Sequence, residues 1–93
     1  MNLPVVYGEM TIKQRRLVRE EYTRRQNGLC QYCQEHLSDP PAKAVRDAKI
    51  LKKLFPPGFF IHPVHLHHDH NTGLTIGAVH NHCNAVLWQY HGE

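Results

Sequence analysis

Apolar and polar residues alternate along the chain with two different periods. The first helical pattern follows Thr11, a candidate N-cap, and stops at Asn27-Gly28, a pair that commonly ends helices. A helix is therefore predicted from Thr11 to about Gln26. Its expected buried residues are Leu17, Val18 and Tyr22.

A second helical pattern occupies 42–55 and ends at Pro56-Pro57-Gly58. Its apolar positions are Ala44, Val45, Ala48, Ile50, Leu51 and Leu54. Phe59, Phe60 and Ile61 are expected to pack under a sheet. The segment 34–63 is interpreted as an insertion between two halves of a metal-binding unit.

The C-terminal part predicts a β-hairpin followed by a helix. Val64–His68 and Leu74–Val79 are the expected strands, and Asn71 and Gly73 tolerate the backbone angles of the turn between them. Gly77 is a candidate bulge or close-approach point. The final helix is expected from Cys83 to about Tyr90, with Asn81 as N-cap. Its expected core residues are Val86, Leu87 and Tyr90, with Trp88 partly buried.

These elements predict one small α+β domain over 1–93. A chain of 93 residues buries a modest core and is expected to need a staple. Its three cysteines cannot all pair as disulfides, and neither a signal peptide nor a membrane-spanning apolar run is expected. A cytoplasmic, reducing compartment, a metal staple and no membrane partner are therefore expected.

Positive charge is confined to one half of the chain. The formal net charge is only +3, but every Lys and Arg lies between Lys13 and Lys53. Clustered basic groups bind phosphates by releasing counterions, so a nucleic-acid partner is expected, although solvated helix faces are the simpler interpretation. The candidate contacts are Arg15, Arg16, Arg19, Lys49, Lys52 and Lys53.

Two pairs of metal-binding residues share one spacing. Cys30 and Cys33 form a CxxC turn, and His80 and Cys83 repeat the same separation. Such pairs can make a Cys3His zinc tetrahedron, with His82 as an alternative to His80. A redox CxxC would require an adjoining βαβ pattern, which is missing, and the remaining alternative is that the cysteines are simply buried.

A second cluster combines the hairpin with the start of the last helix. His67 and Asn84 could hold one divalent ion with positions open to water and phosphate, which suits Mg²⁺ or Mn²⁺. His68 has a pKa suited to a general base near neutral pH. Adjacent strand residues normally point to opposite faces, so His67 and His68 can share a site only if the strand twists or ends there.

The combination of CQYC, LHHDHNTG and HNHCN resembles the HNH endonucleases with the ββα-metal (His-Me finger) fold. It is most similar to the recombination endonuclease VII subgroup, over about 29–90 and interrupted by the insertion. The resemblance implies zinc knuckles at 29–33 and 80–84 and a ββα-metal core at 64–91, after an arm and basic helix over 1–28.

By position, the resemblance implies that His68 is the general base and that Asn84 is a ligand of the catalytic ion. His67 stands where the subgroup commonly has Asp, which favours Mn²⁺ or a softer ion over Mg²⁺. Asp69 and His70 are expected to orient His68 or to fix the turn. His80 replaces a usual Cys of the zinc site.

The expected function is metal-dependent hydrolysis of DNA phosphodiester bonds with low sequence specificity. The resemblance implies that the products carry 5′-phosphate and 3′-hydroxyl ends. A monomer should nick one strand, whereas a double-strand cut would need a homodimer. A bacterial or phage-encoded protein is expected. The alternatives are a zinc-stapled nucleic-acid-binding module without catalysis and a purely structural zinc protein. A zinc peptidase is disfavoured because no HExxH pair occurs.

Overall fold

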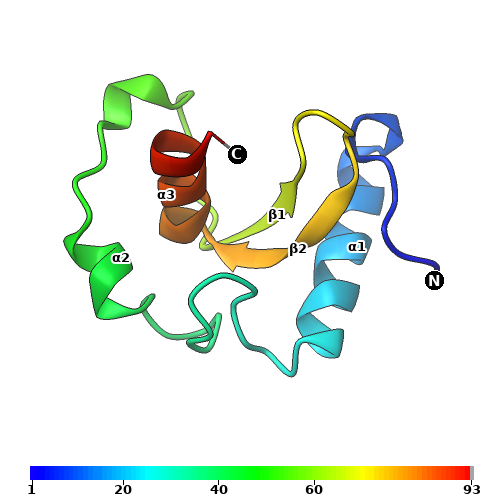
Figure 1. Cartoon of the computed structure of the whole chain (residues 1–93). Helices are drawn as coiled ribbons and strands as arrows, with labels where there is room; N and C mark the ends of the chain where they lie inside the picture. The colour runs from blue at the N-terminus through cyan, green and yellow to red at the C-terminus, as the bar shows by residue number, and fades with distance from the viewer. Residues whose placement is uncertain (93) are drawn as a thin grey trace.

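A computed structural model describes residues 1–92 of the chain. A two-stranded antiparallel sheet lies between helices from both ends of the chain (Figure 1). The elements in chain order, with η for a 3-10 helix, are η1 (Tyr7–Glu9), α1 (Ile12–Arg25), α2 (Lys43–Asp47), η2 (Lys52–Leu54), β1 (Val64–His68), β2 (Thr75–His80) and α3 (Asn81–His91). The expected α+β class is confirmed. Over 1–92, each helix is too short or too polar to span a bilayer.

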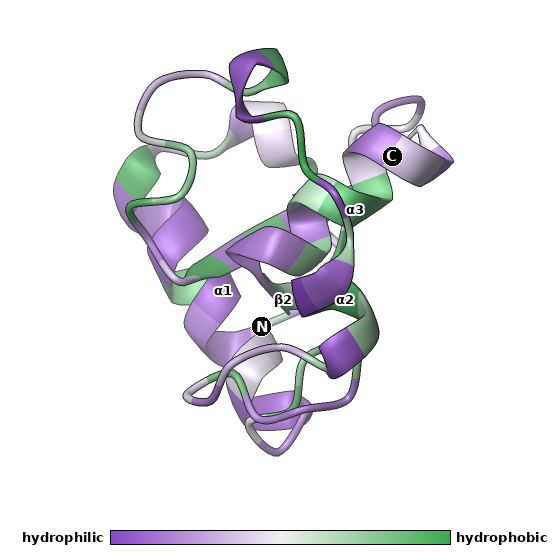
Figure 2. Cartoon of the chain, turned by 90° about the vertical axis from the view of Figure 1, so that its left-hand side faces the viewer, coloured by the Kyte–Doolittle hydropathy of each residue, from purple (hydrophilic) through white to green (hydrophobic). Residues whose placement is uncertain are grey.

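α1 begins and ends where the sequence predicts. Thr11 Oγ1 accepts a hydrogen bond from the Gln14 N–H at 3.1 Å, and Gln14 Oε1 accepts one from the Thr11 N–H at 2.8 Å. This capping box satisfies N–H groups that lack helical partners. Asn27 and Gly28 have φ of 56° and 78°, which ends the helix. Most α1 side chains are charged, so its ribbon is largely purple in Figure 2.

The hairpin follows the prediction with one shift. β1 has the expected bounds, whereas β2 runs from Thr75 to His80, one residue later at each end than expected. Leu74 pairs with Val6 of the N-terminal arm instead. The strand register changes between His67 and His68, which face Gly77 and Thr75. Ile76 of β2 is left between the two partners as an extra residue, which is the arrangement of a β-bulge on β2.

The prediction of a continuous helix over 42–55 is wrong. α2 ends at Asp47, its C-cap Ala48 has an extended ψ of 135°, and only the short η2 follows. The side chain of Gln89 on α3 holds the intervening segment. It accepts a hydrogen bond from the Leu51 N–H at 3.0 Å and donates one to the Lys49 carbonyl at 2.9 Å. These tertiary bonds replace helical ones, so packing overrides the helical spacing.

The last helix begins at Asn81, earlier than the predicted Cys83, and its N-cap is His80. The side chain of Asn81 therefore does not cap the helix. It donates to the carbonyls of Phe60 at 3.1 Å and His62 at 3.0 Å. Asn81 thus ties the end of the insertion to the start of α3.

The core surrounds the cysteines. Its buried members are Cys30, Leu37, Val45, Ala78, Val79, Cys83 and Val86. α1 contributes Val18 as its buried residue, so the expected burial of Leu17 is wrong, at 44% exposed. Ile61 and Tyr90 are also exposed against expectation, at 75% and 53%. Tyr90 stays at the surface because its hydroxyl donates to the Lys49 carbonyl.

Candidate functional site

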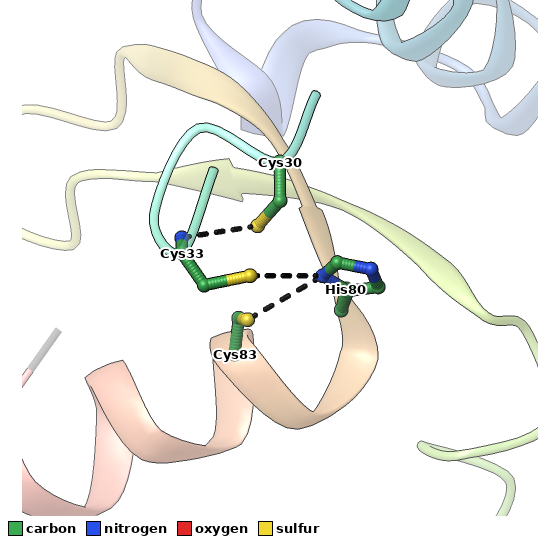
Figure 3. A group of neighbouring side chains, drawn as sticks. All are labelled: Cys30, Cys33, His80 and Cys83. Atoms are coloured by element: carbon green, nitrogen blue, oxygen red, sulfur yellow. Dashed lines mark hydrogen bonds between the residues drawn. The ribbon is translucent and has the colours of Figure 1, made fainter. Parts of the chain in front are cut away.

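Cys30, Cys33, His80 and Cys83 form a group that could hold a zinc ion (Figure 3). Their ligand atoms all lie within 4.8 Å of one another. Nδ1 of His80 lies 3.5 Å from the Cys33 sulfur and 3.6 Å from the Cys83 sulfur. A zinc tetrahedron with bonds of about 2.1–2.3 Å has edges of roughly 3.5–3.8 Å, so the two distances from Nδ1 of His80 to sulfur fit the ion.

His80 has the protonation that a metal ligand needs. Its Nε2 lies 2.9 Å from the carbonyl oxygens of both His36 and Asp39. A carbonyl can only accept, so Nε2 carries the hydrogen and Nδ1 presents its lone pair to the sulfurs. His82 instead places Nδ1 2.8 Å from Oδ1 of Asn81 and lies outside the cluster. The geometry therefore favours His80 over His82 as the ligand.

Backbone hydrogen bonds shape the CxxC turn and attach it to β2. The Cys30 N–H donates to Glu35 and the Gln34 N–H donates back to Cys30, at 2.8 and 3.0 Å. The Gln31 N–H then donates to the Ala78 carbonyl of β2 at 3.0 Å. This last bond fixes the CxxC turn beside the end of β2, where His80 lies.

The cysteines of the Cys3His group shift each other's pKa values in a buried environment. A hydrogen bond with the Cys83 thiol lowers the pKa of Cys30, and the backbone N–H of Cys33 acts in the same direction. The same bond raises the pKa of Cys83, and burial adds to that effect. Cys30 and Cys83 are fully buried. A dication would neutralise the negative charge that such a cluster accumulates.

The second predicted cluster lines a groove of about 1020 Å³ between α1, the hairpin, the insertion and α3. His67, His68, His70 and Asn84 all line it, whereas Asp69 does not. Adjacent residues of β1 reach the groove together because His68 is the last residue of the strand, where strict alternation no longer holds. The strand ends at His68, which is one of the two conditions under which the sequence allowed His67 and His68 to share a site.

His68 is held between neighbouring rings. Its imidazole stacks on Tyr7, with ring centroids 3.9 Å apart, and lies 4.8 Å from the ring of His70. Burial lowers the pKa of His68, and repulsion by His70 and then His67 adds to the shift. The imidazole is thus neutral near pH 7, which is the state that can accept a proton.

Asp69 fixes the turn of the hairpin. Its Oδ1 accepts the N–H groups of Asn71 at 2.7 Å and Thr72 at 3.0 Å. These bonds, Thr72 first, lower the pKa of Asp69. Asp69 is expected either to orient His68 or to fix the turn, and its contacts support the second role.

His65 is a site residue that the sequence interpretation missed. Its Nδ1 lies 3.1 Å from Nδ2 of Asn84, and its ring packs edge-on against Phe59 at 4.6 Å. Burial lowers the pKa of His65. Strand alternation could have identified His65 from the sequence, since it precedes His67 by two positions on β1. His65 lines the same groove.

The basic residues divide into two groups. Arg15, Arg16 and Arg19 line the groove together with Lys13. Lys49, Lys52 and Lys53 lie on the insertion outside the groove lining. The groove therefore combines histidines, one amide and positive charge from α1.

No family model, no curated protein and no solved structure matches the chain. The case for a function rests on the geometry of these residues.

Proposed function

We propose that β1, β2 and α3 form the ββα-metal core of an HNH-type endonuclease that hydrolyses DNA phosphodiester bonds. The single observation that carries this proposal is the shared groove. His67, His68 and Asn84 line the groove that α1 supplies with arginines. A binding module or a structural zinc protein would not need a neutral imidazole beside such a groove.

His68 takes the proton from the attacking water, because its lowered pKa keeps the imidazole neutral. Arg15, Arg16 and Arg19 hold the DNA backbone without reading bases. A divalent ion at His67 and Asn84, Mg²⁺ or Mn²⁺, would supply positive charge for the developing negative charge on the phosphate. A zinc ion at the Cys3His group would serve the fold.

Nicking of supercoiled plasmid tests the proposal. The zinc-loaded protein is incubated with Mg²⁺, Mn²⁺ or no added divalent ion, and open-circular product is followed. We expect divalent-dependent nicking that His68→Ala reduces by about 10²- to 10⁴-fold. His91→Ala is the matched control, because His91 is exposed near the end of α3 and lies outside the groove lining.

The assigned role of His68 would be contradicted if both variants lost activity. It would also be contradicted if both variants kept the wild-type nicking rate. If no protein nicks DNA in any metal while all of them retard it on a gel, the binding module replaces the nuclease.

A further inference from the structure

We propose that the groove takes single-stranded DNA, with phosphates along α1 and an unpaired base against Phe55, Phe59 and Trp88. The identity of the polymer as DNA rests on the proposed function. The preference for an unpaired base rests on the wall that the insertion and α3 give to the groove.

The two walls of the groove differ in chemistry. α1 contributes Lys13, Arg15, Arg16 and Arg19 from one side of the hairpin. The insertion and α3 lie on the other side of the hairpin (Figure 1), and their apolar and aromatic groups line the groove there. Among the described residues that line the groove there is no Asp or Glu. Such a groove complements a ligand that is anionic along one edge and flat and apolar along the other.

The aromatic wall is continuous with the proposed active site. Trp88 packs against Phe55 with centroids 5.3 Å apart, and Phe55 packs against Phe59 at 4.7 Å. Phe59 in turn contacts His65, the neighbour of Asn84. Trp88 follows Asn84 by four residues on α3, which places both on one helix face. Trp88 remains 42% exposed, so part of its ring is open to a ligand.

An aromatic wall favours a strand whose bases are not already stacked. A duplex presents phosphates and groove edges to a protein, while its base faces are covered by neighbouring pairs. A single strand offers free base faces, and its phosphates still reach a basic surface. Basic grooves with aromatic stacking platforms are the general solution for single-stranded nucleic acid.

Fluorescence provides the direct test, because Trp88 is the one tryptophan of the chain. The zinc-loaded protein without added Mg²⁺ or Mn²⁺ is titrated with three DNA probes of 12 nucleotides. They are a single strand, the same strand with abasic sites throughout its central part, and the blunt duplex. We expect the single strand to quench Trp88 and to bind at least tenfold tighter than the other two by anisotropy of a labelled probe.

Variants separate stacking from charge. Trp88→Leu should weaken single-strand binding by about 5- to 100-fold and leave the abasic strand unaffected. Tyr90→Leu is the control, an exposed aromatic on the same helix outside the groove lining. Arg19→Gln should weaken the intact and abasic strands alike and reduce the salt slope by about one.

Equal affinity for intact and abasic strands, or a preference for the duplex without a change in Trp88 fluorescence, would overturn the inference even if plasmid is nicked. Conversely, tight single-strand binding by a protein that cuts nothing would support the inference and reject the nuclease.

Discussion

The ring of Tyr7 lies flat on the imidazole of His68, with centroids 3.9 Å apart and planes 10° from parallel. The guanidinium carbon of Arg15 lies 4.0 Å from the Tyr7 centroid, so Tyr7 is held between the two side chains. Its backbone N–H donates to the Gly73 carbonyl at 2.8 Å, which fixes the arm on the hairpin turn. A residue near the N-terminus therefore restricts the orientation of the proposed base.

Tyr7→Ala should lower the nicking rate by about tenfold, because His68 would sample more rotamers and align less often with the attacked phosphate. Tyr7→Phe should keep the rate, since the stacked ring remains. The measurement is initial nicking rate at saturating plasmid, with DNA affinity and melting temperature followed in parallel. Equal loss in both variants would mean that the hydroxyl, not the stack, matters.

Zinc should hold the fold together through His80. His80→Ala should release zinc and abolish cooperative thermal unfolding, because the cluster lies in the core and metal affinity becomes folding free energy. His82→Ala, two residues along the chain, should retain about one zinc per chain. Metal content by mass spectrometry and melting curves check both variants. Retention of zinc by His80→Ala with loss in His82→Ala would reverse the ligand assignment.

Gly77 permits a close approach that a side chain would block. A Cβ there would lie 2.8 Å from Cγ of Gln31 and 2.9 Å from Oε1 of Gln26. Gln26 Oε1 already accepts the Ala78 N–H at 2.9 Å, so it cannot move without losing that bond. Gly77→Ala should cost about 1–3 kcal/mol of unfolding free energy by denaturant titration.

Gly8→Ala is the matched control for this prediction, because nothing lies within 4 Å of the added Cβ. Its stability should stay within about 0.5 kcal/mol of wild type. A similar change in both glycine variants would argue against the close approach as the cause.

His65 should position Asn84 for the divalent ion. His65→Ala should raise the Mn²⁺ concentration for half-maximal nicking by about 10- to 100-fold, because groups that orient a ligand tune metal affinity by that amount. His62→Ala changes another histidine of the groove and should have a smaller effect. An unchanged Mn²⁺ dependence in His65→Ala would reduce His65 to a packing role.

The sequence by itself determined the features that arise within a few residues of each other. Thr11 and Gln14 set the start of α1, and positive φ at Asn27 and Gly28 set its end. Asp69 and its neighbours form the hairpin turn. The matching spacing within each knuckle also predicted the Cys3His group correctly, because ligand spacing and turn chemistry are local.

Tertiary contacts decided the rest. Gln89 of α3 interrupts the helix expected over 42–55 by binding its backbone at Lys49 and Leu51, which are distant in sequence. Asn81 anchors the insertion at Phe60 and His62, which removes it from the capping role that its sequence position suggested. In both cases a long-range side-chain bond outweighs a local preference, which is worth about 1 kcal/mol or less for helix propensity and roughly 0.5–2 kcal/mol for an N-cap.

The groove belongs to the same class of features. No local pattern predicts that His65 meets Asn84, or that the arginines of α1 face the histidines of β1 across one groove. These contacts depend on how strands pair and on how α3 lies against the sheet. The residue types suited to catalysis are visible in the sequence, but their meeting in one groove is a property of the folded chain.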